Sequence, residues 1–440
     1  MNHQQTLTNC TVLTVDSADT FYPRGRIVVT DGRITAIGNE DTVALQGEVV
    51  DMGDSLVMPG LINTHTHSYS AALRNAADDL KLMDWLQTAI WPMEARLSYE
   101  RSMAASTMSC LEYLQSGITT YVDMFYYTDA TAKAAQRSGL RCFLAAAVFS
   151  NPIVETADSI GAAERFIRAY KGREEETLVY PCIGPHAPYT VTAETWKQCM
   201  DIADRYQVLL HTHLSETADE NRQIFEQTGM SPTAWLESMG VFDRPTLLAH
   251  SIHLSDEDLD IYAKHGAAVS YNPVSNLKLV SGIMPLKKMW ERGISVSLGT
   301  DGAQSNNSMD LLRDLRTGVL IQKQLNDSAA FFNAREAVRM VTIDGARAIG
   351  MEDRLGSLEI GKYADLIALN TESPRLCPLH RESLKNLYAT VTYSACGADV
   401  RDSMVNGRWV MRDGRVLSMD AEQVRKDAQE AAAYMAQDVL

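Results

Sequence analysis

Histidines follow short apolar segments of this chain in a spacing that suits a metal ion. His65 and His67 stand two residues apart at the end of the segment MPGLINTHTH. In a β-strand, residues i and i+2 point to the same side, so both imidazoles can face one ion. The alternative for this segment alone is a buried pair that only satisfies its own hydrogen bonds. The ligand-type residues elsewhere in the chain favour the metal site.

Three further apolar segments end in residues of the same chemical types. QVLLHTHLSE ends in His211, His213 and Glu216, TLLAH ends in His250, and ISVSLGTD ends in Asp301. Imidazole nitrogen and carboxylate oxygen bind zinc, and a catalytic zinc site leaves one position for water. No cysteine belongs to the set, which favours a catalytic over a structural ion. His211 would lie deeper in its strand than His213, so we interpret it as a buried support rather than a ligand.

The elements that must position these residues alternate in type through the middle of the chain. Eight β-rich or apolar segments alternate with helical patterns. They are residues 55–65, 118–125, 141–149, 177–185, 207–213, 246–250, 266–272 and 294–301. This alternation predicts a parallel sheet of the α/β class, and eight units predict a (β/α)8 barrel of the TIM type. Active sites of such barrels lie at the carboxyl ends of the strands, where the ligand-type residues occur. An open doubly wound sheet is the alternative, but no GxGxxG motif follows the first strand.

Both ends of the chain are β-rich and differ from the middle. Hairpin signals occur at Asp31-Gly32, Asn406-Gly407 and Asp413-Gly414. These dipeptides tolerate the positive φ angles of tight turns. We therefore predict a small β-sandwich domain built from residues 1–57 and 356–440, around a metal-binding barrel over residues 58–355. A closing surface helix is expected to begin near Asp420, within the C-terminal part.

Composition limits the classes of partner. The 440 residues include 40 basic and 56 acidic side chains, a formal net charge of −16. This balance argues against binding nucleic acid through its phosphates, which requires clustered Lys and Arg. No secretory signal and no apolar run of about 18 residues is present, so no membrane association is expected. The seven cysteines are scattered and include no CxxC, which is typical of reduced thiols in a cytoplasmic protein. We expect a homo-oligomer that acts on a small molecule.

An ordered series of motifs resembles a known family. The series runs through MPGLINTHTH, LRNAADDLKLMDWLQTAIWPMEARL, GPHAPYT, HTHLSET, NPVSNLKL, LGTDGAQSNN and GSLEIGKYADLI. It resembles the amidohydrolase superfamily, and more narrowly the branch of 5-methylthioadenosine and S-adenosylhomocysteine deaminases. Each motif alone is weak, but the ordered series covers nearly the whole chain.

The resemblance implies a role for each strand-end residue. The implied metal ligands are His65, His67, His213 and Asp301. Asp301 also takes a proton from the attacking water, His250 contacts that water, and Glu216 handles the proton of the substrate's ring nitrogen. Dinuclear relatives carry a carboxylated lysine at the end of strand four, where YPCIGPHAPY has no lysine. One divalent ion per chain, zinc by expectation, is therefore implied.

The resemblance also implies a nucleoside pocket. The segment from Ala76 to Leu97 matches a lid, in which Glu94 accepts hydrogen bonds from the ribose hydroxyls, and His186 contacts the nucleoside. Members that process S-adenosylhomocysteine carry arginines after strand three, and by alignment Ala146 stands where the first would be. We therefore predict hydrolytic deamination of 5′-methylthioadenosine or adenosine in preference to S-adenosylhomocysteine, with release of ammonia and an inosine-type product. Asn272, Ser275 and Asn276 are expected only to shape their loop.

Two other functions remain open at this point. The same metal site could serve a hydrolase of another amino- or chloro-substituted heterocycle, such as an s-triazine, a guanine-type purine or a pterin. A barrel that has lost catalysis is the second alternative. It is disfavoured because every ligand position and both proton-handling positions are filled.

Overall fold

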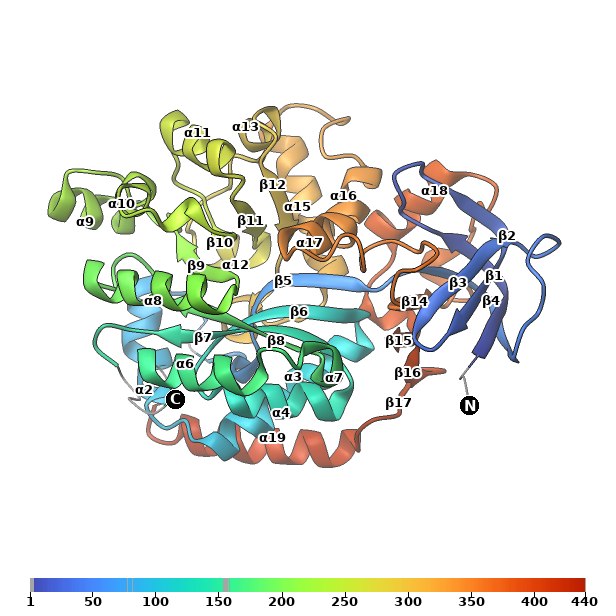
Figure 1. The fold of residues 1–440 in the computed structure, drawn as a ribbon, viewed down its shortest axis with the longest axis horizontal. Coiled ribbons are helices and arrows are strands. Elements are labelled where there is room, and N and C mark those ends of the chain that lie inside the picture. The colour runs from blue at the N-terminus through green and yellow to red at the C-terminus, as the bar shows by residue number, and fades with distance from the viewer. Residues whose placement is uncertain (1–3, 77, 81, 153–156, 158, 440) are drawn as a thin grey trace. The chain divides into compact units, whose positions relative to one another are not determined.

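The computed structural model describes residues 4–76, 78–80, 82–152, 157 and 159–439. Contacts divide the chain into two compact units (Figure 1). The first unit comprises residues 1–63, 111–120 and 310–420, and the second comprises residues 64–110, 121–309 and 421–440. Our predicted domain boundaries at 57/58 and 355/356 stay predictions.

A nine-stranded curled sheet forms the barrel. Its strands are β5 (Leu61–His67), β6 (Ile118–Phe125), β7 (Arg141–Val148), β8 (Val179–Pro185), β9 (Leu210–Leu214), β10 (Thr246–His250), β11 (Ala268–Tyr271), β12 (Ser295–Leu298) and β13 (Asp301–Gly302). Pairing is parallel from β7 to β12, and β13 pairs in parallel with β5, with Asp301 opposite Thr66. Only Gly299 and Thr300 separate β12 from β13, so the two pieces act as one eighth strand that closes the ring. The predicted barrel is confirmed.

Helices follow the strands, as the sequence pattern predicted. Those between the barrel strands are α3 (Tyr99–Gln115), α4 (Thr128–Ser138), α6 (Ile160–Tyr170), α7 (Glu174–Thr177), α8 (Ala193–Tyr206), α9 (Ala218–Thr228), α10 (Pro232–Ser238), α11 (Asp256–His265), α12 (Pro273–Lys278) and α13 (Leu286–Glu291), with the 3-10 turn η3 (Val241–Asp243). The short helix α14 (Ala303–Asn306) follows the last barrel strand, β13. Side-chain caps start several of them; Thr192, Thr217 and Ser255 each accept a backbone N–H of the first turn. Figure 1 shows α6 and α8 beside β8, against which both pack.

The segment after β5 carries short helical pieces. They are the 3-10 helix η1 (Ser68–Leu73), α1 (Leu82–Trp85), the π-helical turn η2 (Leu86–Ile90) and α2 (Trp91–Glu94). Residues 77 and 81 of the predicted lid lie outside the described residues. The side chains of Trp85, Ile90 and Met93 are buried.

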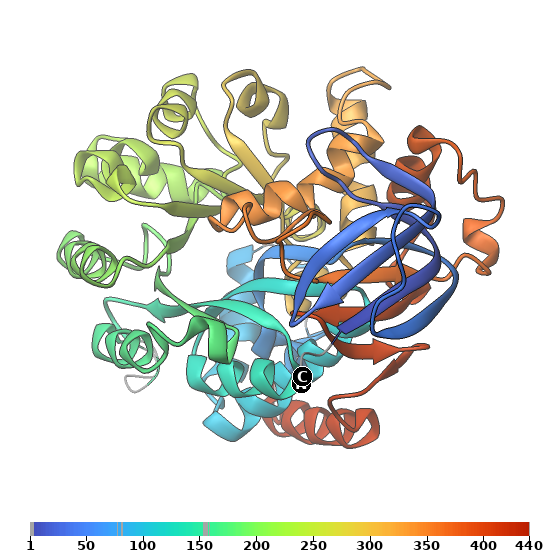
Figure 2. The ribbon, with the colours of Figure 1, turned by 45° about the vertical axis from the view of Figure 1, so that its right-hand side comes forward.

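The terminal segments form one eight-stranded sheet. Its strands are β1 (Gln4–Leu13), β2 (Phe21–Thr30), β3 (Arg33–Asn39), β4 (Glu48–Pro59), β14 (Leu366–Leu369), β15 (Val400–Val405), β16 (Arg408–Arg412) and β17 (Arg415–Val416). The two ends of the chain meet where β4 pairs antiparallel with β14 (Figure 2). Asp31-Gly32, Asn406-Gly407 and Asp413-Gly414 all have positive φ, as expected for tight turns. Strands from both ends contribute to one hydrophobic core, so the predicted small domain is a single continuous sheet around a shared core.

Further helices belong to the same unit as this sheet. They are α15 (Leu311–Leu325), α16 (Ala334–Met340), α17 (Ile343–Ala348), α18 (Leu384–Ala389), the 3-10 turns η4 (Pro374–Leu376) and η6 (Gly397–Asp399), and the π-helical turn η5 (Thr390–Ser394).

The closing helix α19 (Ala421–Ala436) groups with the barrel unit rather than with the terminal sheet. The guanidinium of Arg101 lies 3.5 Å from the ring centroid of Tyr434 on this helix. A helical pattern predicts the helix but does not identify the unit on which it packs. Within the described ranges, none of the helices has the length and apolar character needed to cross a membrane.

Candidate active site

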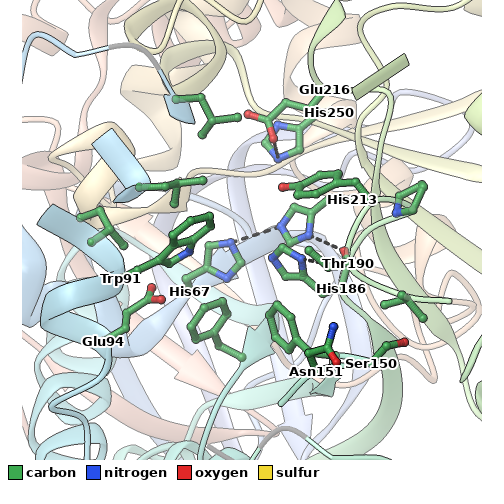
Figure 3. Close-up of a pocket in the computed structure, with 18 of the residues that line it drawn as sticks. His67, Trp91, Glu94, Ser150, Asn151, His186, Thr190, His213, Glu216 and His250 are labelled. Carbon is green, nitrogen blue, oxygen red and sulfur yellow. Dashed lines mark hydrogen bonds and ion pairs between the residues drawn. The ribbon is translucent and has the colours of Figure 1, made fainter. Parts of the chain in front are cut away.

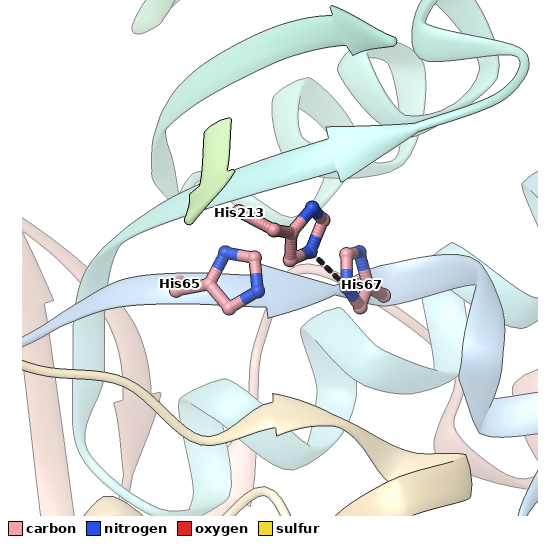
Figure 4. Close-up of side chains that lie close together, drawn as sticks. All are labelled: His65, His67 and His213. Atoms are coloured by element: carbon pink, nitrogen blue, oxygen red, sulfur yellow. Dashed lines mark hydrogen bonds between the residues drawn. The ribbon is translucent and has the colours of Figure 1, made fainter. Parts of the chain in front are cut away.

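Four ligand-type side chains converge at the carboxyl ends of three barrel strands. His65 and His67 come from β5, His213 from β9 and Asp301 from the start of β13. Figure 4 shows the three imidazoles turned toward one another. Nε2 of His67 lies 3.2 Å from Oδ1 of Asp301 and 3.4 Å from Nε2 of His213, and Nε2 of His65 lies 3.5 Å from the same Oδ1. All four side chains are buried.

The outer ring nitrogens fix the orientation of two of these histidines. Nδ1 of His67 donates to the Met124 carbonyl at 2.7 Å, and Nδ1 of His213 donates to the His186 carbonyl at 2.8 Å. Because a carbonyl oxygen only accepts, Nδ1 of each ring carries hydrogen, and in the neutral ring Nε2 is left with a lone pair that faces the cluster. Metal-binding histidines are oriented in this way by their second nitrogen.

His65 is oriented through a second histidine. Its Nδ1 lies 2.8 Å from Nε2 of His211, whose own Nδ1 donates to the Leu247 carbonyl at 2.8 Å. The carbonyl places the hydrogen of His211 on Nδ1, so Nε2 of His211 accepts from His65 and Nε2 of His65 is bare. The structure thus places His211 behind His65, in the supporting position that the sequence predicted.

The carboxylate of Asp301 is held on both oxygens. Ser275 and Ser305 donate to Oδ2 at 2.6 and 3.1 Å, and the backbone N–H of Gly302 donates to Oδ1 at 2.8 Å. Burial raises the pKa of Asp301, but the adjacent His65 and His67 outweigh it and hold the pKa well below its usual value. Three bare imidazole nitrogens and one ionised carboxylate fit a zinc-type cation.

Glu216 lies next to this cluster on the loop that follows β9 (Figure 3). Its Oε2 is 3.7 Å from Nε2 of His250, and the hydroxyl of Ser281 donates to Oε1 at 3.3 Å. The loop is fixed by Glu220, whose carboxylate accepts the backbone N–H groups of Ser215 and Glu216 at 2.9 and 2.8 Å. Burial, followed by the negative charge of Asp301, raises the pKa of Glu216 to about 8. The side chain is therefore a carboxylic acid that holds its proton at neutral pH.

His250 contacts two residues that the sequence did not place in the site. The side-chain amides of Asn276 and Asn272 reach its Nδ1, at 2.8 and 3.3 Å. Together with the Ser275 contact to Asp301, these bonds correct the expectation that NPVSN only shapes its loop. All three side chains are buried behind the reacting groups.

The cluster opens into a cavity of about 610 Å³, a size typical of small-molecule sites. Aromatic and aliphatic side chains form most of its wall, including Trp85, Trp91, Phe125, Phe149 and Leu279. Its polar lining residues include all the predicted site residues except His65, which lies behind the cavity surface: His67, Glu94, His186, His213, Glu216, His250 and Asp301.

Glu94 presents an unused acceptor in this cavity. Its Oε1 accepts a hydrogen bond from the hydroxyl of Tyr69, a contact that sequence reasoning missed. Its Oε2 is buried without a hydrogen-bond partner among the described residues. Burial raises the pKa of Glu94 to about 8. A buried oxygen without a partner favours a ligand that supplies hydroxyl groups.

His186 lies on the opposite side of His67 from Trp91 in Figure 3. Its ring stacks on Phe149 with centroids 4.4 Å apart, and its Nδ1 is 3.0 Å from the hydroxyl of Thr190. Burial lowers the pKa of His186 to about 3, so the imidazole is neutral.

The cavity contains no arginine or lysine among its described lining residues. Ala146 is buried within β7 and does not line the cavity; Phe149, Ser150 and Asn151 are the lining residues that follow this strand. Residues 153–156 and 158 of the segment considered for arginines lie outside the described residues. Arg141 begins β7 at the end away from the cluster and bonds the hydroxyl of Tyr180 at 3.3 Å.

Comparisons with known proteins agree with this geometry. The chain matches the amidohydrolase family over residues 56–410. A 5′-deoxyadenosine deaminase of Methanosarcina barkeri (strain Fusaro) is 40% identical over 425 residues, which cover 96% of each chain. A 5-methylthioadenosine/S-adenosylhomocysteine deaminase of Desulforamulus reducens is 37% identical, over 97% of this chain and 98% of its own. Among solved structures, an adenosine deaminase of Xanthomonas campestris with bound zinc has a TM-score of 0.93 and 29% identity, over 98% of each chain.

Proposed function

The chain belongs to the amidohydrolase family, and from this premise we propose that it is a metal-dependent deaminase of adenosine-type nucleosides. It hydrolyses the amino group of the adenine ring and releases ammonia and the inosine-type product. The observation that carries the proposal is the protonated, buried Glu216 beside a His-His-His-Asp cluster. Hydrolytic deamination of an aromatic ring needs both a nucleophile and an acid for the ring nitrogen.

We assign one zinc ion per chain to His65, His67, His213 and Asp301. When bound, such an ion lowers the pKa of its water from ~15.7 to about 7. The orientation of the three imidazoles through Met124, His186 and His211 supports this assignment. The end of β8 supplies no lysine for a second ion.

The protein's own groups then move the protons. Asp301 accepts a proton from the attacking water, and His250 donates a hydrogen bond to the oxygen that adds to the ring carbon. Glu216 donates its proton to the neighbouring ring nitrogen, which makes loss of aromaticity less costly. Glu216, now a carboxylate, takes the proton of the new hydroxyl group and passes it to the amino group, which leaves as ammonia while the ring carbon becomes a carbonyl. The proton held by Asp301 then returns to Glu216 and restores both groups.

The seven cysteines are free thiols, which favours a reducing, cytoplasmic location for this proposed enzyme. A homo-oligomer stays a prediction, which light scattering of the purified protein would check.

Glu94 is proposed to bind the ribose. Its Oε2 is the acceptor that the 2′ and 3′ hydroxyls would satisfy. Hydroxyl groups that donate to Glu94 favour its ionised form, so at a pH above 8 we expect the wild type to favour adenosine over 2′-deoxyadenosine by about 10- to 150-fold in kcat/KM, the range for one hydrogen bond to a charged group. Glu94→Gln should reduce this preference, because the Tyr69 hydroxyl occupies the one acceptor oxygen of the amide and the NH2 group that is left can only donate. The exposed Glu100→Gln is the control, and an unchanged preference in Glu94→Gln would refute the ribose assignment.

The substituent on the 5′ carbon is expected to be uncharged. No described lining residue is an arginine or lysine that could pair with an amino acid carboxylate. We therefore expect kcat/KM for 5′-methylthioadenosine or adenosine to exceed that for S-adenosylhomocysteine by about 10- to 150-fold.

Ammonia release from the zinc-loaded enzyme tests both the reaction and this preference. The panel contains adenosine, 5′-deoxyadenosine, 5′-methylthioadenosine and S-adenosylhomocysteine, with guanine, a pterin and an s-triazine as the other classes. A preference for S-adenosylhomocysteine would refute the argument from charge. Turnover of only the last three compounds would replace the proposed substrate class.

A further inference from the structure

His250 ends β10 with its two ring nitrogens in different surroundings. Nε2 lies 3.7 Å from Oε2 of Glu216, on the cavity side. Nδ1 instead faces the segment after β11, where the amide nitrogens of Asn276 and Asn272 lie 2.8 and 3.3 Å away. His250 has only 2% of its surface exposed, so this protein environment controls the position of its hydrogen.

The orientation of the Asn272 amide is set by a third residue. The hydroxyl of Ser270 donates to Oδ1 of Asn272 at 3.3 Å, which leaves the NH2 group turned toward His250. An NH2 group only donates, so Nδ1 of His250 must present a lone pair. If Nδ1 of His250 carried a hydrogen, that hydrogen would face the NH2 group of Asn272, and two donors cannot form a hydrogen bond with each other. The amide of Asn276 must therefore also present its NH2 group to Nδ1.

This pattern is the reverse of the one at the metal ligands. His67 and His213 donate from Nδ1 to a carbonyl, which leaves Nε2 bare. His250 accepts at Nδ1, so its Nε2 carries the hydrogen. By position alone, His250 could join His65 and Asp301 as a ligand. A nitrogen that carries hydrogen has no lone pair for an ion, so the two asparagines exclude this role.

We propose that Asn272 and Asn276 are positioning residues that fix His250 as the neutral Nε2–H tautomer. His250 then acts only as a hydrogen-bond donor to the oxygen that adds to the ring, neither as a base nor as a ligand. A donor fixed before the reaction stabilises the charge that develops on that oxygen without reorganisation. The catalytic meaning rests on the proposed function, whereas the tautomer itself is a property of the protein alone.

Nitrogen NMR of the zinc-loaded protein, labelled with 15N-histidine, reads the tautomer without substrate. Long-range 1H–15N correlations distinguish the ring nitrogen that carries hydrogen from the bare one, and the signals absent in His250→Gln identify His250. The wild type should show hydrogen on Nε2. Asn276→Asp replaces the closer donor, at 2.8 Å, with a charged acceptor, which should outweigh the longer 3.3 Å contact of Asn272 and move the hydrogen to Nδ1. Asn221→Asp, the same change at an asparagine that donates to the His253 carbonyl, is the control.

Kinetics connect the tautomer to turnover. Asn276→Asp should lower kcat by about 10²- to 10³-fold, the range for loss of one hydrogen-bond donor to a developing oxyanion, with KM and zinc content near those of Asn221→Asp. Hydrogen on Nδ1 in the wild type, or a doubly protonated ring, would overturn the proposal even if no variant folds. Hydrogen retained on Nε2 in Asn276→Asp would overturn it as well. An Nε2–H signal in a protein without deaminase activity would support the tautomer and refute the proposed function.

Discussion

Replacing His65 with alanine is expected to remove both the bound metal and the deaminase activity. Nε2 of His65 lies 3.5 Å from the Asp301 carboxylate at the centre of the cluster, and the residue is fully buried. Alanine cannot supply a nitrogen, and the ion would keep only three protein ligands in the set. Elemental analysis should find one zinc per wild-type chain and essentially none in the variant, with ammonia release at the background rate.

Comparison of His211→Phe with His65→Ala distinguishes a residue that supports a metal ligand from the ligand itself. His211→Phe keeps a ring behind His65 but removes the acceptor for its Nδ1. Loss of such a support lowers metal affinity by about 10- to 100-fold, so zinc should return to this variant at higher concentration, but not to His65→Ala. His265→Ala, at a histidine that pairs with Glu237 outside the cluster, is the control. Two ions per active wild-type chain would contradict the mononuclear site.

The convergence of the four residues that we propose as metal ligands could be predicted because their signal is local. A histidine pair at i and i+2 shares a face of a strand, and the carboxyl ends of parallel barrel strands meet at one end. These two rules bring His65, His67, His213 and Asp301 together without knowledge of any loop. The same rules put His211 one step deeper than His213, where the structure has it.

The residues that orient the reacting groups carry no such signal. Tyr69, Ser281 and Asn276 reach Glu94, Glu216 and His250 from other elements. Small polar residues after a strand are also what an ordinary turn requires, so their types alone indicate a loop. Only the path of the backbone after β5 shows that Tyr69 faces the site, and only the path after β11 shows this for Asn276 and Ser281.

The pairing of strands that are far apart in the sequence is likewise a part of the fold that local patterns do not predict. The hairpins at Asp31-Gly32 and Asn406-Gly407 follow from adjacent residues, and both were predicted. The pairing of β4 with β14 joins segments more than 300 residues apart in the sequence, and no local pattern encodes it. The location of α19 in the barrel unit is a second example, because several surfaces could cover its apolar stripe.

Glu216→Gln is expected to lower kcat by about 10²- to 10⁴-fold, the usual contribution of a general acid–base group. Glutamine has nearly the same shape and can still accept from Ser281, so the pocket should keep its form. It cannot donate a proton to the ring nitrogen and then recover it. KM should change much less than kcat, and ammonia release measured with saturating adenosine gives the comparison.

The dependence of kcat/KM on pH provides a second test of Glu216 as the proton donor. Burial raises the pKa of Glu216 from 4.5 to about 8, so the proton is present at neutral pH and is lost as the pH rises through 8. The wild-type kcat/KM should therefore fall on the alkaline side. His250, Asp301, Glu220, His67 and Tyr189 are the titratable groups that interact with Glu216. All of them remain in Glu216→Gln, so loss of the alkaline fall in this variant would assign it to Glu216.

Metal content distinguishes proton transfer from ligation at this residue. Glu216→Gln should retain one zinc per chain, because the cluster is complete without it. Glu226→Gln, at an exposed position of the helix that follows Glu216, should match the wild type in both turnover and metal. If Glu216→Gln instead loses its zinc while Glu226→Gln keeps it, Glu216 binds the ion, and the proton on the ring nitrogen must come from another group.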